Sequence, residues 1–511
     1  MKKYNVFKVL LIALFVAIIC SFLIPQSQIG YTGIEKGLIN PITFVDSISN
    51  GLTSFSVFIS SFIYILSIGI FYAVLKKTDK YDDVINNTAA KFKNKKLFIV
   101  ISVLIFGLLT AVIGEIFALL FLVPAFIDIA KKLGYNSTQA ILSTVGAIII
   151  GSTGSLYTNY ANQILKTTVS SNIVVKLIIL AIYLLALILF VILGSKPVDT
   201  KLEKKKVAKG LPISIAFDVI LVLLIVGMVP WNAYFGFEGF TDFHNALVDF
   251  KLFKVSLFNA VLGTTLVAFG EWTIYSLTVL ILVVSVVLAI IYRIKVDGLL
   301  ESISQGIRKS LPYAMILIIA NTILVGVYNS GFFITVIDSV GKMKDSILSS
   351  VTLSGLSALV YPDYTYASQF TLSTLAAVIS KTAIFTTLAV IFQVVYSLVL
   401  LVSPTSVLLL MALRYEQVSY KDWFKYIYKF FLGLLIVLLV IAMIIGGKYV
   451  KTISYVVLAV LVVILALLFV LTGNKKTAKP SKKLVKKEVK KEVTKKKTPK
   501  KTAKKKNNKK K

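Results

Sequence analysis

Two clusters of small polar residues interrupt long apolar runs, and their residue types suit the binding of an ion or a carboxylate. The first is GSTGSLYTN, at Gly151–Asn159, and the second is VSPTS, at Val402–Ser406. Lipid cannot hydrogen-bond to backbone groups, so a helix that breaks at membrane depth persists only where it lines a cavity. One such break in each half of a chain is typical of a transporter whose site lies near the membrane midplane.

The first cluster is the richer set of candidate ligands. We expect four side chains with hydroxyl or amide groups to contact a solute: Ser152, Thr153, Ser155 and Asn159. Backbone carbonyl groups around Gly151 and Gly154 are candidates for binding a coupling cation. The alternative is that the glycines and serines only allow helices to pack closely. The density of polar groups favours a binding site.

The second cluster contains a proline that must break its helix. Pro404 removes a backbone donor, and the hydroxyl groups of Ser403, Thr405 and Ser406 can replace the lost partner. We assign Thr405 and Ser406 to the solute and Ser403 to the coupling ion. The alternative is an ordinary proline kink satisfied by its own hydroxyl groups, and the cluster alone does not distinguish the two.

Two carboxylates lie between apolar segments. Asp363 belongs to YPDYTYAS, at Tyr361–Ser368, and Glu115 follows Gly114 at the end of an apolar run. Ionisable groups within a membrane are rare and usually functional. We therefore assign Asp363 and its neighbour Thr365 to the solute, and Glu115 to a cation or a proton. The alternative for Tyr361–Ser368 is a loop exposed to water.

Motifs of enzymatic chemistry are absent from the sequence. It contains no glycine-rich loop of the Walker type, no HExxH motif, no Cys/His cluster and no nucleophile elbow. We therefore predict that the protein is not an enzyme and binds no metal or cofactor other than Na⁺ or H⁺ as a coupling ion. Without an ATP site, transport would be driven by gradients.

Composition predicts a membrane protein. Of the 511 residues, 57% are hydrophobic and 15% are charged, and the mean hydropathy is +0.87. A helix needs roughly 18 or more mostly apolar residues to cross a bilayer. Ten runs approach or reach this length: Val6–Ile24, Phe55–Val74, Leu97–Ile113, Val174–Leu193, Ile213–Val229, Trp272–Tyr292, Leu311–Val327, Ala383–Val402, Leu432–Ile445 and Ile453–Leu471. We predict an all-α polytopic protein of about 10–12 spans.

Shorter segments complete this helical pattern. Apolar pieces such as Phe117–Ile129, Ala140–Ile150 and Thr371–Ile379 are too short to span and suit half-helices or re-entrant hairpins. Asp297–Ile307 and Tyr420–Phe431 have an apolar stripe opposite polar residues, which predicts amphipathic helices at the membrane interface.

Basic residues indicate orientation and divisions. Lys and Arg gather in alternate loops, which predicts a plasma-membrane protein with both termini in the cytoplasm. The predicted divisions are an N-terminal membrane repeat, a basic linker, a C-terminal membrane repeat, an extra span and a Lys-rich tail, at residues 1–194, 195–210, 211–446, 447–473 and 474–511. The tail carries 20 Lys and 2 Glu and almost no apolar residues, which predicts disorder.

The stretch Ser403–Tyr426 resembles the C-terminal signature of the four-carbon dicarboxylate anaerobic carrier-like family, which belongs to the ion transporter superfamily. The pattern is Pro-Thr-Ser, an apolar run and then Val-x-Tyr-x-x-Trp-x-Lys. Its positions here are Pro404, Thr405, Ser406, Val418, Tyr420, Trp423 and Lys425. Ile68–Asp83 and Phe121–Asn136 are similar to the family too. The resemblance covers roughly Leu10–Ile445 and implies two inverted repeats whose hairpin tips and broken helices surround a midplane site.

One departure from the family bears on substrate choice. Tyr364 and Tyr366 stand where the family has glycines in a hairpin tip. Our leading hypothesis is a symporter or antiporter of a small carboxylate-bearing solute, such as an amino acid or organic acid. Membrane lipid and a second copy of the chain, in a homodimer, are the other expected partners. The alternative is a degenerate carrier that acts as a membrane anchor, with its tail bound to ribosome, RNA or another nucleic acid, or anionic lipid.

Overall fold

The computed structural model describes residues 5–30, 33–155, 160–167, 172–194, 197–198, 210–343, 346–378 and 382–473. Asn159, most of the basic linker and the Lys-rich tail lie outside the described residues. The contacts divide the chain into a compact unit, Met1–Leu461, and a second unit, Val462–Lys511.

Within the described residues, eight helices are long and apolar enough to cross a membrane, and each overlaps a predicted run. They are α1 (Asn5–Leu23), α3 (Ile59–Lys77), α5 (Lys95–Ile113), α10 (Ile173–Leu193), α11 (Leu211–Met228), α15 (Ile274–Ile291), α16 (Val296–Ser330) and α23 (Tyr420–Gly446). The other two predicted runs form α21 (Phe385–Val399) and α24 (Thr452–Gly473). The prediction of a helical polytopic protein is confirmed, and the inverted repeats remain a prediction.

Shorter helices connect these spans. They are α2 (Phe44–Val57), α4 (Tyr81–Lys91), η2 (Ala118–Phe121), α6 (Val123–Lys132), α7 (Ser137–Ile141), η3 (Leu142–Gly146), α8 (Ala147–Gly151), η4 (Ser152–Gly154), α9 (Tyr160–Ile164), α12 (Trp231–Phe235), α13 (Gly239–Asp249), α14 (Leu257–Leu262), α17 (Phe332–Gly341), α18 (Ser346–Val360), α19 (Tyr364–Ala367), η5 (Ser368–Leu372), α20 (Ser373–Val378), η6 (Thr382–Ile384), α22 (Val407–Tyr415) and η7 (Gly447–Tyr449). Two antiparallel hairpins pair β1 (Ser27–Gly30) with β2 (Gly33–Lys36), and β3 (Lys251–Leu252) with β4 (Val255–Ser256). The segments η3 and η5 are π-helices, a form that is frequent at functional sites.

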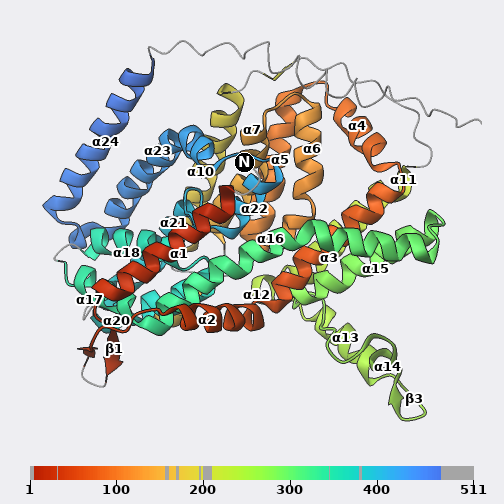
Figure 1. Cartoon of the computed structure of the whole chain (residues 1–511), viewed down its shortest axis with the longest axis horizontal. Coiled ribbons are helices and arrows are strands. Elements are labelled where there is room, and N and C mark those ends of the chain that lie inside the picture. The colour runs from red at the N-terminus through yellow and green to blue at the C-terminus, as the bar shows by residue number, and fades with distance from the viewer. Residues whose placement is uncertain are drawn as a thin grey trace, which may run out of the picture. The chain divides into compact units, whose positions relative to one another are not determined.

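Helix α16 crosses α1, α2 and α3 (Figure 1). Its tightest contact with α3 depends on two glycines. A Cβ atom on Gly306 would lie 2.5 Å from the Cα of Ile70, and one on Gly69 would lie 2.7 Å from the carbonyl oxygen of Gly306. Small residues of this kind let helix backbones touch inside a membrane.

The two predicted interfacial helices are not separate elements. Asp297–Ile307 continues through Pro312 into the apolar part of α16, and Tyr420–Phe431 is the first part of α23. Pro312 lacks a backbone donor, so it removes one hydrogen bond within α16. A helix that packs against neighbours can continue through proline when nearby groups satisfy the freed carbonyl.

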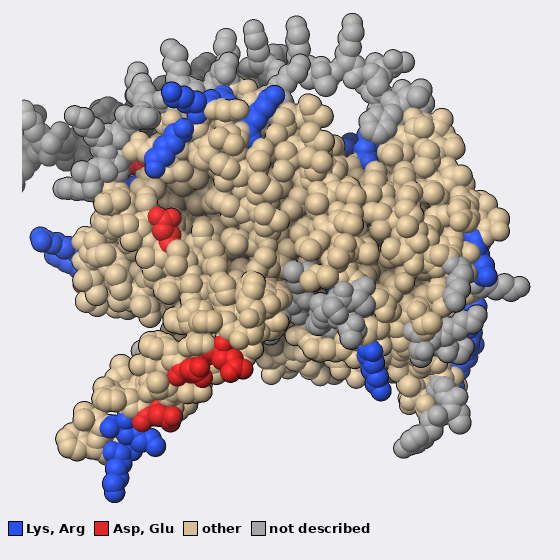
Figure 2. Space-filling view, turned by 180° about the vertical axis from the view of Figure 1, so that it is seen from behind, with Lys and Arg blue, Asp and Glu red and all other residues tan. Residues whose placement is uncertain are grey.

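The surface and the core differ as a membrane protein requires. Viewed from behind, the charged side chains of the described residues gather toward the edges and on the segment that carries α13 and α14, and a wide uncharged area lies between (Figure 2). Large apolar side chains such as Ile12 on α1 and Leu185 on α10 are exposed, as contact with lipid would require. In contrast, α21 is buried from Leu388 to Val399, so it forms part of the core.

Candidate functional site

The first polar cluster ends a helix inside the protein. Helix α8 passes into the short turn η4, and the chain leaves helical geometry at Ser155 (φ −56°, ψ 123°). The hydroxyl groups of Ser152 and Thr153 donate to carbonyl groups of the preceding helical turn, each at 2.7 Å. Thr153 and Ser155 are buried and Ser152 is partly buried. The predicted break is therefore present.

The two glycines of this cluster allow close packing. A Cβ atom on Gly151 would lie 2.4 Å from the carbonyl oxygen of Gly107, and one on Gly154 would lie 2.6 Å from the side chain of Leu180. No larger residue fits at these positions without a shift of α5 or α10. Packing thus accounts for both glycines, and their role as ion ligands remains a prediction.

The second cluster joins three helices. Between α21 and α22, the Ser403 hydroxyl donates to the carbonyl oxygen of Ala358 at 2.8 Å, and the Thr405 hydroxyl donates to that of Leu359 at 3.1 Å. Both carbonyl groups belong to the last turn of α18. Carbonyl groups in the last turn of a helix have no backbone N–H partner within that helix. Ser406 is buried at the start of α22. The hydroxyl groups of Ser403 and Thr405 therefore tie the break to α18.

The family signature downstream of Pro404 completes the same structure. The indole nitrogen of Trp423 donates to the carbonyl oxygen of Leu401 at 2.8 Å, and the Tyr420 hydroxyl donates to that of Val402. These carbonyl groups precede Pro404, where the helix has ended. Trp423 is fully buried. The Pro-Thr-Ser motif and the Tyr-x-x-Trp motif are thus two parts of one helix break.

Gln393 of α21 connects the first break to the core. Its side-chain nitrogen donates to the carbonyl oxygens of Ser152, at 3.0 Å, and Ser155, at 2.9 Å. Its side-chain oxygen is buried and has no hydrogen-bond partner within the described part of the chain. Buried polar atoms are nearly always hydrogen-bonded, so this oxygen is a candidate contact for a solute.

The two predicted carboxylates each accept a hydrogen bond from the backbone. Gly114 ends α5 in the left-handed conformation (φ 81°), which places Glu115 outside the helix. Glu115 accepts a hydrogen bond from the backbone of Phe117 at 3.0 Å, and Asp363 accepts one from the backbone of Tyr366 at 3.2 Å. Both side chains are partly buried, and their roles as ligands remain predictions.

The hairpin tip around Asp363 is packed rather than exposed. Tyr361 is 2% exposed, and its carbonyl oxygen accepts a hydrogen bond from the Tyr396 hydroxyl at 2.7 Å. The ring of Tyr364 lies 5.4 Å from that of Tyr396. Asp363 and Thr365 are partly buried. The alternative of a loop exposed to water is therefore wrong, because aromatic rings fill the space around the tip.

A cavity of about 480 Å³ lies between α3, α16 and α22. Four cationic residues line it together with three tyrosines: Lys76, Arg308, Lys309, Arg414, Tyr72, Tyr313 and Tyr415. Its inner wall includes Leu120, Val145 and Leu408. Val145 precedes the first break and Leu408 follows the second, so the cavity is bounded by the helices that the two breaks interrupt.

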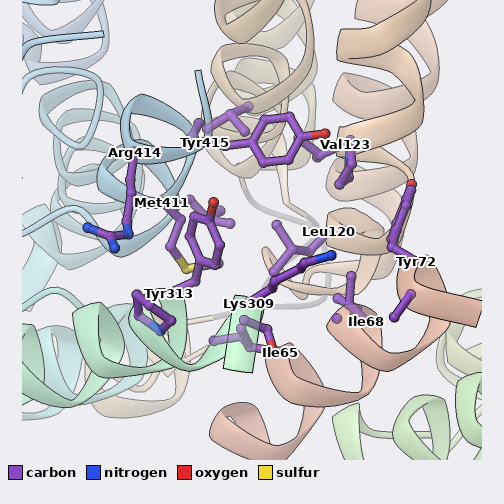
Figure 3. Close-up of a pocket in the computed structure, with 18 of the residues that line it drawn as sticks. Ile65, Ile68, Tyr72, Leu120, Val123, Lys309, Tyr313, Met411, Arg414 and Tyr415 are labelled. Carbon is purple, nitrogen blue, oxygen red and sulfur yellow. The ribbon is translucent and has the colours of Figure 1, made fainter. Parts of the chain in front are cut away.

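The charges around the cavity are predominantly positive. No Asp or Glu is among the described residues that line it. The amino group of Lys309 points into the cavity, and Arg414 turns toward its edge (Figure 3). The guanidinium group of Arg414 lies 4.8 Å from the ring of Phe7, a cation–π contact. Arg308 and Lys309 make no ion pair with another described residue, so their charges remain available to an anion.

Sequence comparison decides the family. The model of the DcuC family, C4-dicarboxylate anaerobic carrier, matches residues 2–447. The chain belongs to this carrier family. It is therefore a multi-pass membrane transporter and not an enzyme. No curated protein matches the carrier in sequence.

Two solved structures are similar to this carrier. The YdaH transporter of Alcanivorax borkumensis is 12% identical, with a TM-score of 0.40, and the match covers 87% of this chain and 98% of that one. MtrF of Neisseria gonorrhoeae, from a class of antimetabolite efflux pumps, is 13% identical, with a TM-score of 0.36, over 86% of this chain and 94% of that one.

Several residues of the site are not evident from the carrier's sequence. Lys76 and Arg414 begin basic loops, and the sequence indicates only that these loops face the cytoplasm. Gln393 is a polar residue in an apolar run, which indicates that its side chain needs hydrogen-bond partners. The sequence does not indicate which residues supply them. Of the predicted ligands, Asn159 lies outside the described residues. None of the others lines the cavity, and their roles remain predictions.

Proposed function

We propose that the chain is a secondary active transporter of a small carboxylate-bearing solute such as an organic acid or an amino acid. The cavity between α3, α16 and α22 is the observation that carries this proposal, because four cations and no described carboxylate line it. Its volume of about 480 Å³ suits a small molecule. Arg and Lys form charge-assisted hydrogen bonds with carboxylates. The family's description as a C4-dicarboxylate carrier supports the same class of solute.

The two helix breaks support a route beyond the cavity. Polar groups at both breaks lie among buried apolar side chains, where they would contact a solute that has left water. We propose Ser152, Thr153 and Ser155 as ligands from one predicted half. Asp363, Thr365, Thr405 and Ser406 are the proposed ligands from the other. The excess of basic residues in the loops beside the cavity favours a cytoplasmic opening.

Glu115 supports coupling to a cation. It is partly buried, and a carboxylate withdrawn from water is stabilised when a proton or Na⁺ neutralises it. We propose Glu115 as an ion ligand, with Ser403 and the carbonyl groups of Gly151 and Gly154 as further candidates. Exchange of one solute for another is the alternative form of gradient-driven transport.

Uptake into proteoliposomes tests the function. The purified chain is reconstituted, and uptake of radiolabelled succinate, malate, aspartate and arginine is measured under Na⁺, H⁺ and exchange gradients. We expect saturable uptake of at least one of these solutes. The absence of saturable uptake of every solute under every gradient would refute the proposal.

A double variant tests the cavity. Arg308→Gln with Lys309→Gln removes two cations that have no acidic partner, so the half-saturation concentration should rise about tenfold or more. The inhibition of uptake by salt should weaken, because salt screens the attraction that has been removed. Lys421→Gln, an exposed lysine of α23 outside the cavity, is the matched control and should leave uptake unchanged. Equal half-saturation in the double variant and the control would show that the cavity is not the entry for the solute.

A further inference from the structure

Lys176 is a buried lysine within a candidate membrane span. It lies in the first turn of α10, and its side chain is only 1% exposed. It forms no ion pair or hydrogen bond through its amino group with any residue that the structure describes. A charged group taken out of water without a partner is unfavourable. Ionisable groups retained in such positions usually serve function.

A second unsatisfied group lies one turn away. Asn172, which precedes α10, is 3% exposed and donates to the side-chain oxygen of Asn162 at 3.1 Å. The side-chain oxygen of Asn172 itself is buried and accepts no hydrogen bond from the described residues. Residues four apart share one face of a helix, and side chains lean toward the helix N-terminus. The Lys176 side chain therefore leans toward Asn172.

This face of α10 is directed at the first helix break. Leu180 lies one turn beyond Lys176 on the same face, and its side chain is the group that a Cβ atom on Gly154 would meet at 2.6 Å. The Gln393 side chain reaches the same break and contacts the carbonyl oxygens of Ser152 and Ser155. Its free oxygen adds a third unsatisfied polar atom. Lys176 and Asn172 therefore lie on the face of α10 that packs against the first break one turn further along, and Gln393 reaches that break from α21.

We propose that Lys176 binds a carboxylate group of the transported solute at the first break, and that Asn172 accepts a hydrogen bond from a hydroxyl or amino group of the same solute. This inference rests on the proposed function and adds a site to it. No residue of α10 lines the cavity between α3, α16 and α22, so Lys176 is a binding point separate from the cationic cavity.

The positive charge and the hydrogen-bond donors of Lys176 favour a carboxylate on the solute over a cationic or a neutral group. An ammonium group offers three donors and a positive charge, and a carboxylate satisfies both. The oxygens of Asn172 and Gln393 can only accept. A solute with a carboxylate and a nearby donor satisfies all of these groups at once, as an amino acid or a hydroxy acid does and a plain dicarboxylate does not.

Uptake by lysine variants tests the proposal. Lys176→Met removes the charge and keeps much of the volume, so the half-saturation concentration for the best solute of the succinate, malate, aspartate and arginine panel should rise about tenfold to a hundredfold. Lys176→Arg keeps the charge and should stay within about threefold of the wild-type value. Lys8→Met, an exposed lysine on α1, is the matched control. Half-saturation in Lys176→Met equal to that in Lys8→Met would overturn the proposal.

A competition experiment separates binding from a structural role. An unlabelled acid should inhibit uptake by the wild-type chain far better than its neutral amide. In Lys176→Met, this preference should fall by about tenfold or more, because the group that distinguishes charge is gone. An unchanged preference, or failure of both Lys176→Met and Lys176→Gln to give folded protein, would assign Lys176 a structural role and overturn the proposal. Wild-type protein without uptake of any solute would instead refute the proposed function.

Discussion

Replacing Gln393 by leucine should destabilise the junction between α21 and the first helix break. The substitution keeps the size of the side chain and removes the donor that serves two carbonyl groups, those of Ser152 and Ser155. An intramolecular hydrogen bond contributes about 0.5–1.5 kcal/mol net to stability. The loss of two such bonds therefore predicts a fall of about 1–3 kcal/mol in the free energy of unfolding.

This loss corresponds to a measurable shift in melting temperature. Unfolding entropy scales with length and is on the order of 1 kcal/mol/K for a chain of 511 residues. The Tm of Gln393→Leu should therefore fall by about 1–3 °C. The measurement is thermal unfolding of purified protein in detergent, at one scan rate for all variants, because membrane proteins often unfold irreversibly.

A matched glutamine provides the control. Gln305 is exposed on α16, and its side chain donates to that of Glu301 at 2.9 Å. Gln305→Leu removes a hydrogen bond that water can replace, so its effect should stay within about 0.5 kcal/mol. A Tm for Gln393→Leu that matches that of Gln305→Leu would refute the reasoning, because the two hydrogen bonds from Gln393 would then add nothing to stability. Gln393→Leu with a lowered Tm and normal uptake would confirm the structural contact and exclude its oxygen as a solute ligand.

Three further predictions concern stability. Trp423→Phe removes the donor to the buried carbonyl group of Leu401 and should lower the Tm by about 1–3 °C; an unchanged Tm would contradict the account of the second break. Gly306→Ala places a methyl group 2.5 Å from the α3 backbone and should cost about 1–3 kcal/mol, whereas Gly433→Ala, with no atom within 4 Å, should be neutral in the same unfolding assay. Hydrogen bonds from the side chain and then the backbone of Thr43 hold the pKa of Asp46 below its ordinary value. The stability that Asp46 adds is therefore present above the unfolded-state pKa and lost as pH falls through the lower folded-state value. The Tm gap between wild type and Asp46→Asn at neutral pH should therefore narrow as pH falls below the ordinary Asp value of 3.8.

The helix breaks could be predicted from the sequence, but their partners could not. Glycine, proline and small polar residues alter the backbone locally, so Gly151–Ser155 and Pro404 signal a break wherever they occur in an apolar run. Gln393 lies 238 residues from Ser155 along the chain, and its flanking residues are apolar on both sides. Only the packing of α21 against η4 shows which carbonyl groups it serves.

Lys176 shows the same limit for a charge. In the sequence it lies near the start of the apolar run Val174–Leu193, where a lysine commonly lies at the water boundary of a span. The packing of α10 buries it instead. Burial depends on the neighbouring helices and not on the local sequence pattern. The residue types near Lys176 therefore do not distinguish a lysine at the membrane boundary from a lysine that binds a solute.

The family resemblance and the choice of solute depend on different residues. In the signature stretch, Ser403 and Thr405 donate to α18, and Tyr420 and Trp423 donate to the carbonyl groups before Pro404. These hydrogen bonds hold the second break in shape, which explains how a motif can mark the family without specifying a substrate.

A group can recognise a solute only if it has hydrogen-bonding capacity or charge that the protein leaves unused. Among the described residues, the side-chain oxygens of Gln393 and Asn172, the amino group of Lys176 and the cavity residues Arg308 and Lys309 meet this condition. Two relatives that share the signature but differ at these positions should therefore share a fold and transport different acids. Substitutions at Lys176, Asn172 and Gln393 should change the preference among solutes, and substitutions at Tyr420 and Trp423 should change only stability.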